Sequence, residues 1–120
     1  MAVKPSRDFF SEGIGLFNQG RYFECHEVWE EAWKRSHGAE KRFLQGLIQA
    51  AVAILHAERG NLKGAASVYA KAREKLDALP ASHCGIALGE FRIALDEYFD
   101  AALNEKPQAR RSRPKLRRAR

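Results

Sequence analysis

Apolar residues recur along the chain with the three- and four-residue spacing of amphipathic helices, and glycine or proline interrupts the pattern at intervals. We therefore predict five helices, over residues 6–18, 22–36, 39–59, 62–79 and 83–104. Ser6, Asn61 and Ser82 stand where N-cap residues are expected. No stretch alternates apolar and polar positions with β-branched residues, so the sequence predicts no strands.

A weak internal repeat predicts how these helices are paired. Gly20 matches Gly60, 40 residues later, and Trp29 in the first copy matches Tyr69 in the second. Each copy consists of a helix, a tight glycine turn and a second helix, so we expect two antiparallel hairpins. Both glycines are expected to have positive φ. With the fifth helix packed against the hairpins, the predicted fold is a compact all-α bundle.

The third predicted helix, residues 39–59, is apolar around nearly its whole circumference. Such a helix is normally central and covered by its neighbours. Its small residues form one stripe that allows another helix to approach closely. The polar residues left on it form a single stripe, which consists of Gln45, Gln49 and His56.

The second predicted helix also carries polar residues beside its apolar face. His26 and Glu30 are four residues apart, so they lie side by side at the edge of the face that contains Trp33. We expect these two residues to face Gln45, Gln49 and His56 across the contact between the two helices. The reason is that each buried polar group without a partner costs about 1–3 kcal/mol.

This cluster admits three interpretations. It is a structural network, a small-ligand pocket, or a divalent metal site. The pocket would be lined by His26, Glu30, Trp33, Gln45, Gln49 and His56. The metal ligands would be His26, Glu30 and His56, although a glutamate replaces the second histidine of the zinc-protease pattern. No cofactor is predicted.

An enzymatic alternative uses the same residues. In a small hydrolase-like enzyme, His26 would act as general base and Glu30 would orient its ring. This interpretation requires the cluster to open to solvent in a pocket of a few hundred Å³.

The charge of the chain is divided unevenly. The net charge is +6, but residues 106–120 contain 8 Lys or Arg and no acid, which leaves 13 basic against 15 acidic residues in 1–105. We expect one helical domain over residues 1–105 and a basic, disordered tail over 106–120. The tail is a candidate for nucleic-acid binding by counterion release, although no aromatic residue lies among its arginines.

Other features point to the cytoplasm. The N-terminus shows no signal peptide, and the longest run without a charge, residues 43–57, is too short and polar for a membrane span. Cys25 and Cys84 lie far apart in no metal-binding spacing, so free thiols are expected. The aromatic face allows a homodimer without requiring one.

Two blocks of sequence resemble the domain-of-unknown-function family 309. The first is residues 17–33, FNQGRYFECHEVWEEAW, which carries an HExxE motif. The second is residues 43–49, FLQGLIQ, followed by His56 and by residues 60–65, GNLKGA. The resemblance covers residues 8–80 and implies a small all-α bundle, but it carries no activity to this chain.

The family pattern selects nearly the same residues as the helical spacing. The positions that match its signature include His26, Glu27, Glu30, Trp33, Gln45, Gln49 and His56. Trp29 departs from the pattern, since it stands where the family usually has an aliphatic residue. The arginine-rich tail lies outside the resemblance.

Overall fold

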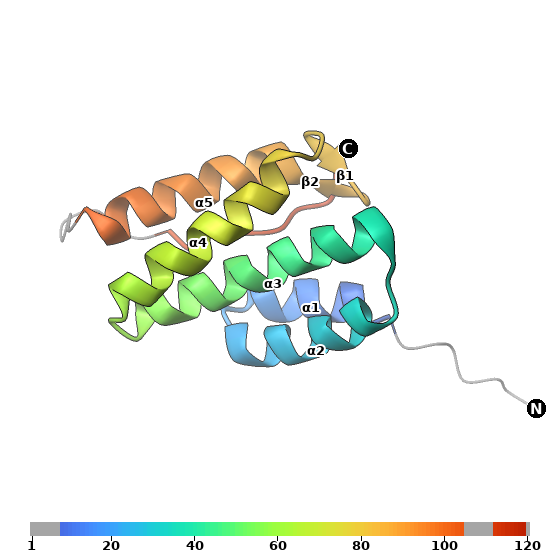
Figure 1. Ribbon diagram of the computed structural model, residues 1–120, viewed down its shortest axis with the longest axis horizontal. Coiled ribbons are helices and arrows are strands. Elements are labelled where there is room, and N and C mark those ends of the chain that lie inside the picture. Colours follow the sequence, from blue (N-terminus) through green and yellow to red (C-terminus); the bar gives the residue numbers. More distant parts are fainter. Residues whose placement is uncertain (1–7, 105–111, 120) are drawn as a thin grey trace, which may run out of the picture.

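The computed structural model describes residues 8–104 and 112–119. In these residues, two helical hairpins and a fifth helix are stacked in layers, with α3 in the middle (Figure 1). The all-α bundle predicted from the sequence is therefore confirmed. The elements are α1 (Phe9–Asn18), α2 (Tyr22–Lys34), α3 (Gly38–Glu58), α4 (Leu62–Asp77), β1 (Ser82–His83), β2 (Ile86–Ala87) and α5 (Leu88–Leu103).

The two hairpins are built on the same type of turn. Gly20 follows α1 with φ 77°, and Gly60 follows α3 with φ 81°, as the repeat predicts. The N–H of Arg21 donates to the carbonyl of Leu16, and the N–H of Asn61 donates to that of His56. These bonds satisfy carbonyls at the helix ends, and glycine tolerates the left-handed conformation that they require.

The N-cap residue predicted from the sequence is correct for α4 and wrong for α1. Asn61 caps α4, and its Oδ1 accepts from the N–H of Gly64 at 3.0 Å. Helix α1 begins at Phe9 and is capped by Asp8, whose side chain accepts from the N–H of Ser11. The expected start at Ser6 is therefore wrong, and Ser6 itself lies outside the described residues.

The expected start of the fifth helix at His83 is also wrong. Residues 82–87 form a small antiparallel hairpin in which Ser82 pairs with Ala87 and His83 with Ile86. Its two turn residues, Cys84 and Gly85, have φ of 49° and 74°. A two-residue turn with both φ values positive matches the twist of the paired strands, whereas cysteine rarely adopts this conformation and so gives no signal in the sequence.

The core contains a group of aromatic rings that joins three helices. Phe17 of α1 lies 5.2 Å from Tyr22 and 5.8 Å from Trp29 of α2, and 5.6 Å from Phe91 of α5, measured between ring centroids. Helix α3 is central as expected, and its small residues lie buried beneath the neighbouring helices. A Cβ atom on Gly46 would lie 2.9 Å from Leu76 of α4, so the glycine allows the close α3–α4 contact.

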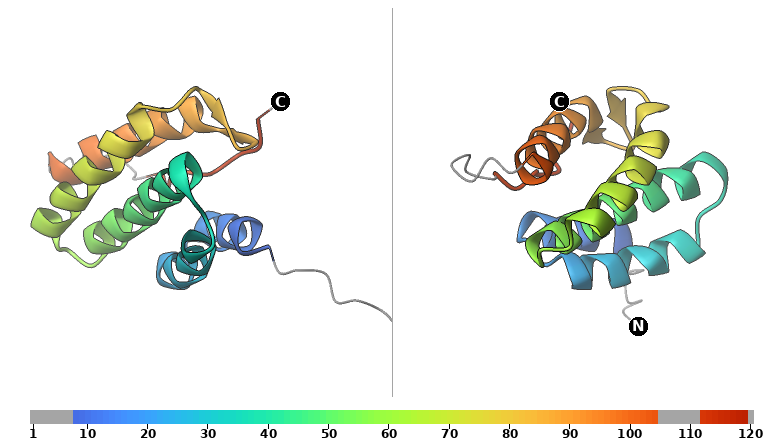
Figure 2. Two further views of the ribbon diagram at one scale, coloured as in Figure 1. Left: turned by 45° about the vertical axis from the view of Figure 1, so that its right-hand side comes forward. Right: turned by 60° about the vertical axis from the view of Figure 1, so that its left-hand side comes forward.

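An arginine of α5 completes the end of α4. Arg92 Nη1 donates to the carbonyls of Leu76 and Leu79 at 2.7 and 2.8 Å. Leu76 lies in the last turn of α4 and Leu79 just beyond it, where helix carbonyls run short of backbone donors; the Leu76 carbonyl also accepts from the N–H of Leu79 at 3.2 Å. Helices α4 and α5 contact each other, and the left view of Figure 2 shows them as neighbours.

We expect Arg92→Met to lower the free energy of unfolding by about 1–3 kcal/mol, because two half-buried carbonyls lose the bonds that Arg92 donates to them. The matched control is Arg59→Met, since Arg59 is exposed. Urea denaturation of the two variants measures the difference. Equal, small losses in both would show that the Arg92 bonds contribute nothing to stability.

Candidate functional site

The contact between α2 and α3 carries a surface groove with a volume of about 370 Å³. It is lined by Glu30, Trp33, Lys34, Gln45, Ile48 and Gln49. Glu30, Trp33, Gln45 and Gln49 were expected at a common site, and the structure brings these four together. The two antiparallel helices place them there, since residues four apart on each helix share a face.

The walls of the groove contain hydrogen-bonding groups that the protein leaves unused. Trp33 is half-buried, and its Nε1 is shielded from solvent without an acceptor in the described residues. The half-buried Gln45 makes no hydrogen bond within that part of the chain. Lys41 Nζ lies 4.1 Å from the centroid of the Trp33 ring, which is a cation–π contact.

Gln49 is held in place by the second helix of its own hairpin. Its Oε1 accepts from Lys75 Nζ of α4 at 2.8 Å. This bond fixes the orientation of the Gln49 amide and connects the groove to α4. Sequence reasoning missed Lys75, because a lysine on an amphipathic helix reads as an ordinary exposed residue.

His26 and Glu30 form an ion pair beside the groove. His26 Nε2 lies 3.0 Å from Glu30 Oε1, and the two side chains are 29% and 48% exposed. Glu30 lines the groove, whereas His26 reaches it only through this pair. The arrangement orients the imidazole ring, as expected from the spacing of four residues.

The expectation of a buried polar network is wrong. In the described residues, no polar or charged residue is fully buried. His56 lies in the last turn of α3, and its Nδ1 is 3.4 Å from Nδ2 of Asn61 rather than in the groove lining. Its separation from Gln49 by seven residues puts it on the same stripe but about 10 Å further along the helix.

The residues weighed as metal ligands do not gather into a ligand set. No group of three or more His, Cys, Asp or Glu side chains suited to a metal ion occurs in residues 8–104 and 112–119. His26 and Glu30 are paired with each other, while His56 contacts Asn61. Cys25 is buried and Cys84 exposed, and both are free thiols.

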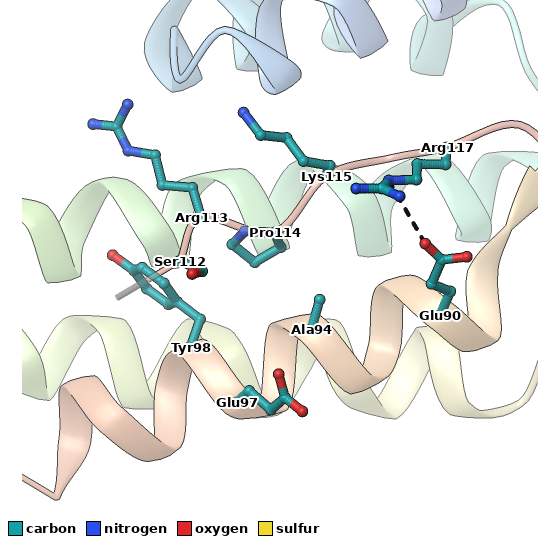
Figure 3. A pocket seen from close by; sticks show the side chains of 9 residues that line it. All are labelled: Glu90, Ala94, Glu97, Tyr98, Ser112, Arg113, Pro114, Lys115 and Arg117. Carbon is teal, nitrogen blue, oxygen red and sulfur yellow. Dashed lines mark ion pairs between the residues drawn. The ribbon is translucent and has the colours of Figure 1, made fainter. Parts of the chain in front are cut away.

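A second cleft, which the sequence did not indicate, lies between α5 and residues 112–119. Its volume is about 230 Å³. Figure 3 shows Tyr98 and Ala94 of α5 facing Ser112 and Pro114, with Arg117 paired to Glu90. Residues 112–119 therefore pack on the domain and differ from the disordered tail expected there. The rest of that tail, 106–111 and 120, lies outside the described residues.

Comparison with known proteins identifies the domain that forms the groove. Residues 10–68 match a family described as "Domain of unknown function (DUF309)". This part of the chain belongs to DUF309. The match spans α1, α2, α3 and the first turns of α4, so both walls of the groove lie within the family domain. The family resemblance noted in the sequence is confirmed.

Two relatives of this chain are longer proteins. An "Uncharacterized protein" of Aquifex aeolicus (strain VF5) is 31% identical over 98 residues, which are 81% of this chain and 29% of the relative. "Uncharacterized protein YpuF" of Bacillus subtilis (strain 168) is 45% identical over 58 residues, 48% of this chain and 33% of the relative. The chain thus spans a third or less of each relative.

None of the helices in the described residues is long and apolar enough to cross a membrane.

Proposed function

We propose that this DUF309 domain binds a small molecule in the groove between α2 and α3. The observation that carries the proposal is that the groove lining contains Trp33, whose shielded Nε1 has no acceptor in the described residues, beside the half-buried Gln45. A shielded donor without a partner is costly, and a half-buried amide at the groove wall is free to bond a ligand, so the two mark positions where a ligand adds hydrogen bonds. The volume of about 370 Å³ is in the range of small-molecule sites.

The lining indicates the chemistry of the ligand. Trp33 and Ile48 offer apolar surface, while the amide of Gln45 both donates and accepts. Glu30 and Lys34 add one charge of each sign. This combination suits a small molecule with a planar or aliphatic body and one edge that both donates and accepts hydrogen bonds.

Fragment binding measured by NMR tests this proposal. We expect heterocycles and carboxamides from a fragment set to shift the Trp33 indole and the Gln45 side-chain amide signals of the labelled protein. Gln45→Ala should weaken such binding by about tenfold, the equivalent of one lost hydrogen bond between ligand and protein. Gln19→Ala changes an exposed glutamine at the end of α1 and is the matched control.

The same variants separate ligand binding from a structural role. Because Gln45 has no partner in the described residues, Gln45→Ala should change the free energy of unfolding by no more than about 0.5 kcal/mol. A loss of about 1–3 kcal/mol, with fragments that fail to shift the groove signals, would favour a structural network instead.

A hydrolase-like enzyme is the alternative for the same site. Its support is the 3.0 Å pair between His26 and Glu30, the arrangement that orients a general base. The reacting bond of a substrate would have to lie within hydrogen-bonding reach of His26, at the edge of the groove rather than inside it. Ligand binding needs no such extension of the site, so we favour it.

Nucleic-acid binding through residues 106–120 has less support from the contacts of residues 112–119. Arg113 pairs with Glu58, Arg117 pairs with Glu90, and Lys115 donates to the backbone carbonyl of Asn18. These contacts compete with phosphate groups for the same cations.

A further inference from the structure

Residues 112–119 are held against the domain in the way that a bound peptide is held. The side chain of Asn18 makes two hydrogen bonds with the backbone of Leu116. Asn18 Nδ2 donates to the Leu116 carbonyl at 2.9 Å, and the Leu116 N–H donates to Asn18 Oδ1 at 2.8 Å. The Asn18 amide thus pairs with both the N–H and the carbonyl of Leu116. A pair of hydrogen bonds of this kind recognises a peptide backbone rather than a particular side chain.

The segment also extends the small sheet. The N–H of Ala87 donates to the carbonyl of Arg117, and the N–H of Ala119 donates to that of Gly85, each at 2.9 Å. Ile86 and Arg118 form an antiparallel bridge. Addition of a strand to an exposed sheet edge is a common mode of peptide recognition, in which backbone bonds supply affinity and side-chain pockets supply specificity.

The side chains of the segment match the surface beneath them. Leu116 is only 3% exposed and is the apolar anchor, with Pro114 also buried. Arg113 Nε lies 2.7 Å from Glu58 Oε1, and Arg117 Nε lies 3.6 Å from Glu90 Oε1. Arg113 and Arg117, on either side of the buried Leu116, therefore face the carboxylates of Glu58 and Glu90.

We infer that Asn18, Glu58, Glu90 and strand β2, here called the Asn18 surface, form a binding site for an extended basic peptide with a leucine anchor. The chain's own residues 112–119 fill the site. A partner protein that presents a leucine between lysine and arginine residues would compete for it. Asn18 and Glu58 lie within the family match, whereas the peptide that fills the site lies outside it.

This site is independent of the groove between α2 and α3 and of any ligand bound there. A covalently attached segment has an effective concentration of the order of millimolar when its linker is short, so an external peptide competes poorly with it. A test must therefore first convert the segment into a separate molecule.

The experiment cuts the folded full chain at a protease site introduced within residues 105–111. The released segment is then exchanged for a fluorescently labelled peptide of residues 112–120. We expect the labelled peptide to bind saturably, and Leu116→Ala in the peptide to weaken binding by at least about tenfold, as expected for an anchor residue. A scrambled peptide of the same charge should bind much more weakly.

Substitutions on the Asn18 surface provide the second part of the test. Asn18→Ala should weaken peptide binding about tenfold, whereas Asn104→Ala, an asparagine at the end of α5, should have no effect. If the cut protein keeps its helical circular dichroism spectrum but shows no saturation up to about 1 mM peptide, the inference is wrong. Equal binding of the scrambled peptide would also overturn it, because charge alone would then suffice.

If the cut protein unfolds, a variant of the uncut chain still tests the inference. Leu116→Ala in the full chain weakens the attached segment while the Asn18 surface stays intact. This variant should therefore bind the labelled wild-type peptide more tightly than the wild-type chain does. Equal affinity of the two uncut chains would contradict the inference.

Discussion

Gly13→Ala is expected to lower the free energy of unfolding by about 1–3 kcal/mol, the usual cost of an overpacked core. The cause is the indole of Trp29, which lies directly over Gly13. A Cβ atom added at Gly13 would lie 2.1 Å from Trp29 Nε1 and 2.3 Å from its Cδ1. Trp29 is fully buried and has no free space into which its ring can move.

The added methyl group would also disturb the hydrogen bond that the Trp29 indole donates. Trp29 Nε1 donates to the carbonyl of Phe10 at 3.1 Å, which ties α2 to the first turn of α1. A ring displaced by the new methyl group would lengthen this bond. The loss outweighs the better helix propensity of alanine, which favours the substitution by only about 0.8–1.0 kcal/mol.

Gly15→Ala in the same helix is the matched control. No heavy atom lies within 4 Å of a Cβ added there. The control should therefore raise the free energy of unfolding by about 0.5–1 kcal/mol through helix propensity alone. Urea denaturation of both variants measures the contrast. If Gly13→Ala also stabilises the protein, Trp29 does not lie over this glycine.

The hairpins were predictable from the sequence because the turn inside each of them carries a local signal. Gly20 and Gly60 end helices where the chain must turn left-handed, and Asn61 offers a side-chain oxygen to cap α4. These signals act within a few residues, so spacing alone reveals them. The hairpin at 82–87 carries only half of such a signal, since Gly85 is suited to positive φ and Cys84 is not.

The candidate site was predicted in part, for a geometric reason. The angular position of a residue on a helix follows from its number, so Glu30, Trp33, Gln45 and Gln49 were placed on facing sides of α2 and α3. Burial does not follow from angle alone. The polar stripe of α3 meets the edge of α2 rather than its centre, so these groups border an open groove instead of an interior network.

The docked C-terminal segment could not be foreseen from composition. A run of arginine and lysine residues resembles a solvated tail, since each charge is costly to bury. Among residues 112–119, only Pro114 and Leu116 are buried, while the cations remain exposed, with Arg113 and Arg117 next to carboxylates. The partners that decide the docking, Asn18, Glu58 and Glu90, are distant in sequence.

Phe17→Ala is expected to lower the free energy of unfolding by about 3–5 kcal/mol, the range for removal of a buried phenylalanine. Phe17 is only 1% exposed, and its ring contacts those of Trp29 and Phe91. No neighbour can close the cavity without breaking its own packing, because all of these rings are held in the core. Phe23→Ala is the matched control, since Phe23 is 53% exposed, and should cost no more than about 0.5 kcal/mol.

The position of Phe17 gives this substitution a second consequence. Its contact with Phe91 joins α1 to α5, and residues 112–119 lie between these two helices (Figure 3). The next residue, Asn18, holds the backbone of Leu116. Loosening α1 should therefore also weaken the labelled peptide on the Asn18 surface, measured under conditions where the variant is still folded. Destabilisation without any change in peptide affinity would show that α5 and β2 alone hold the segment.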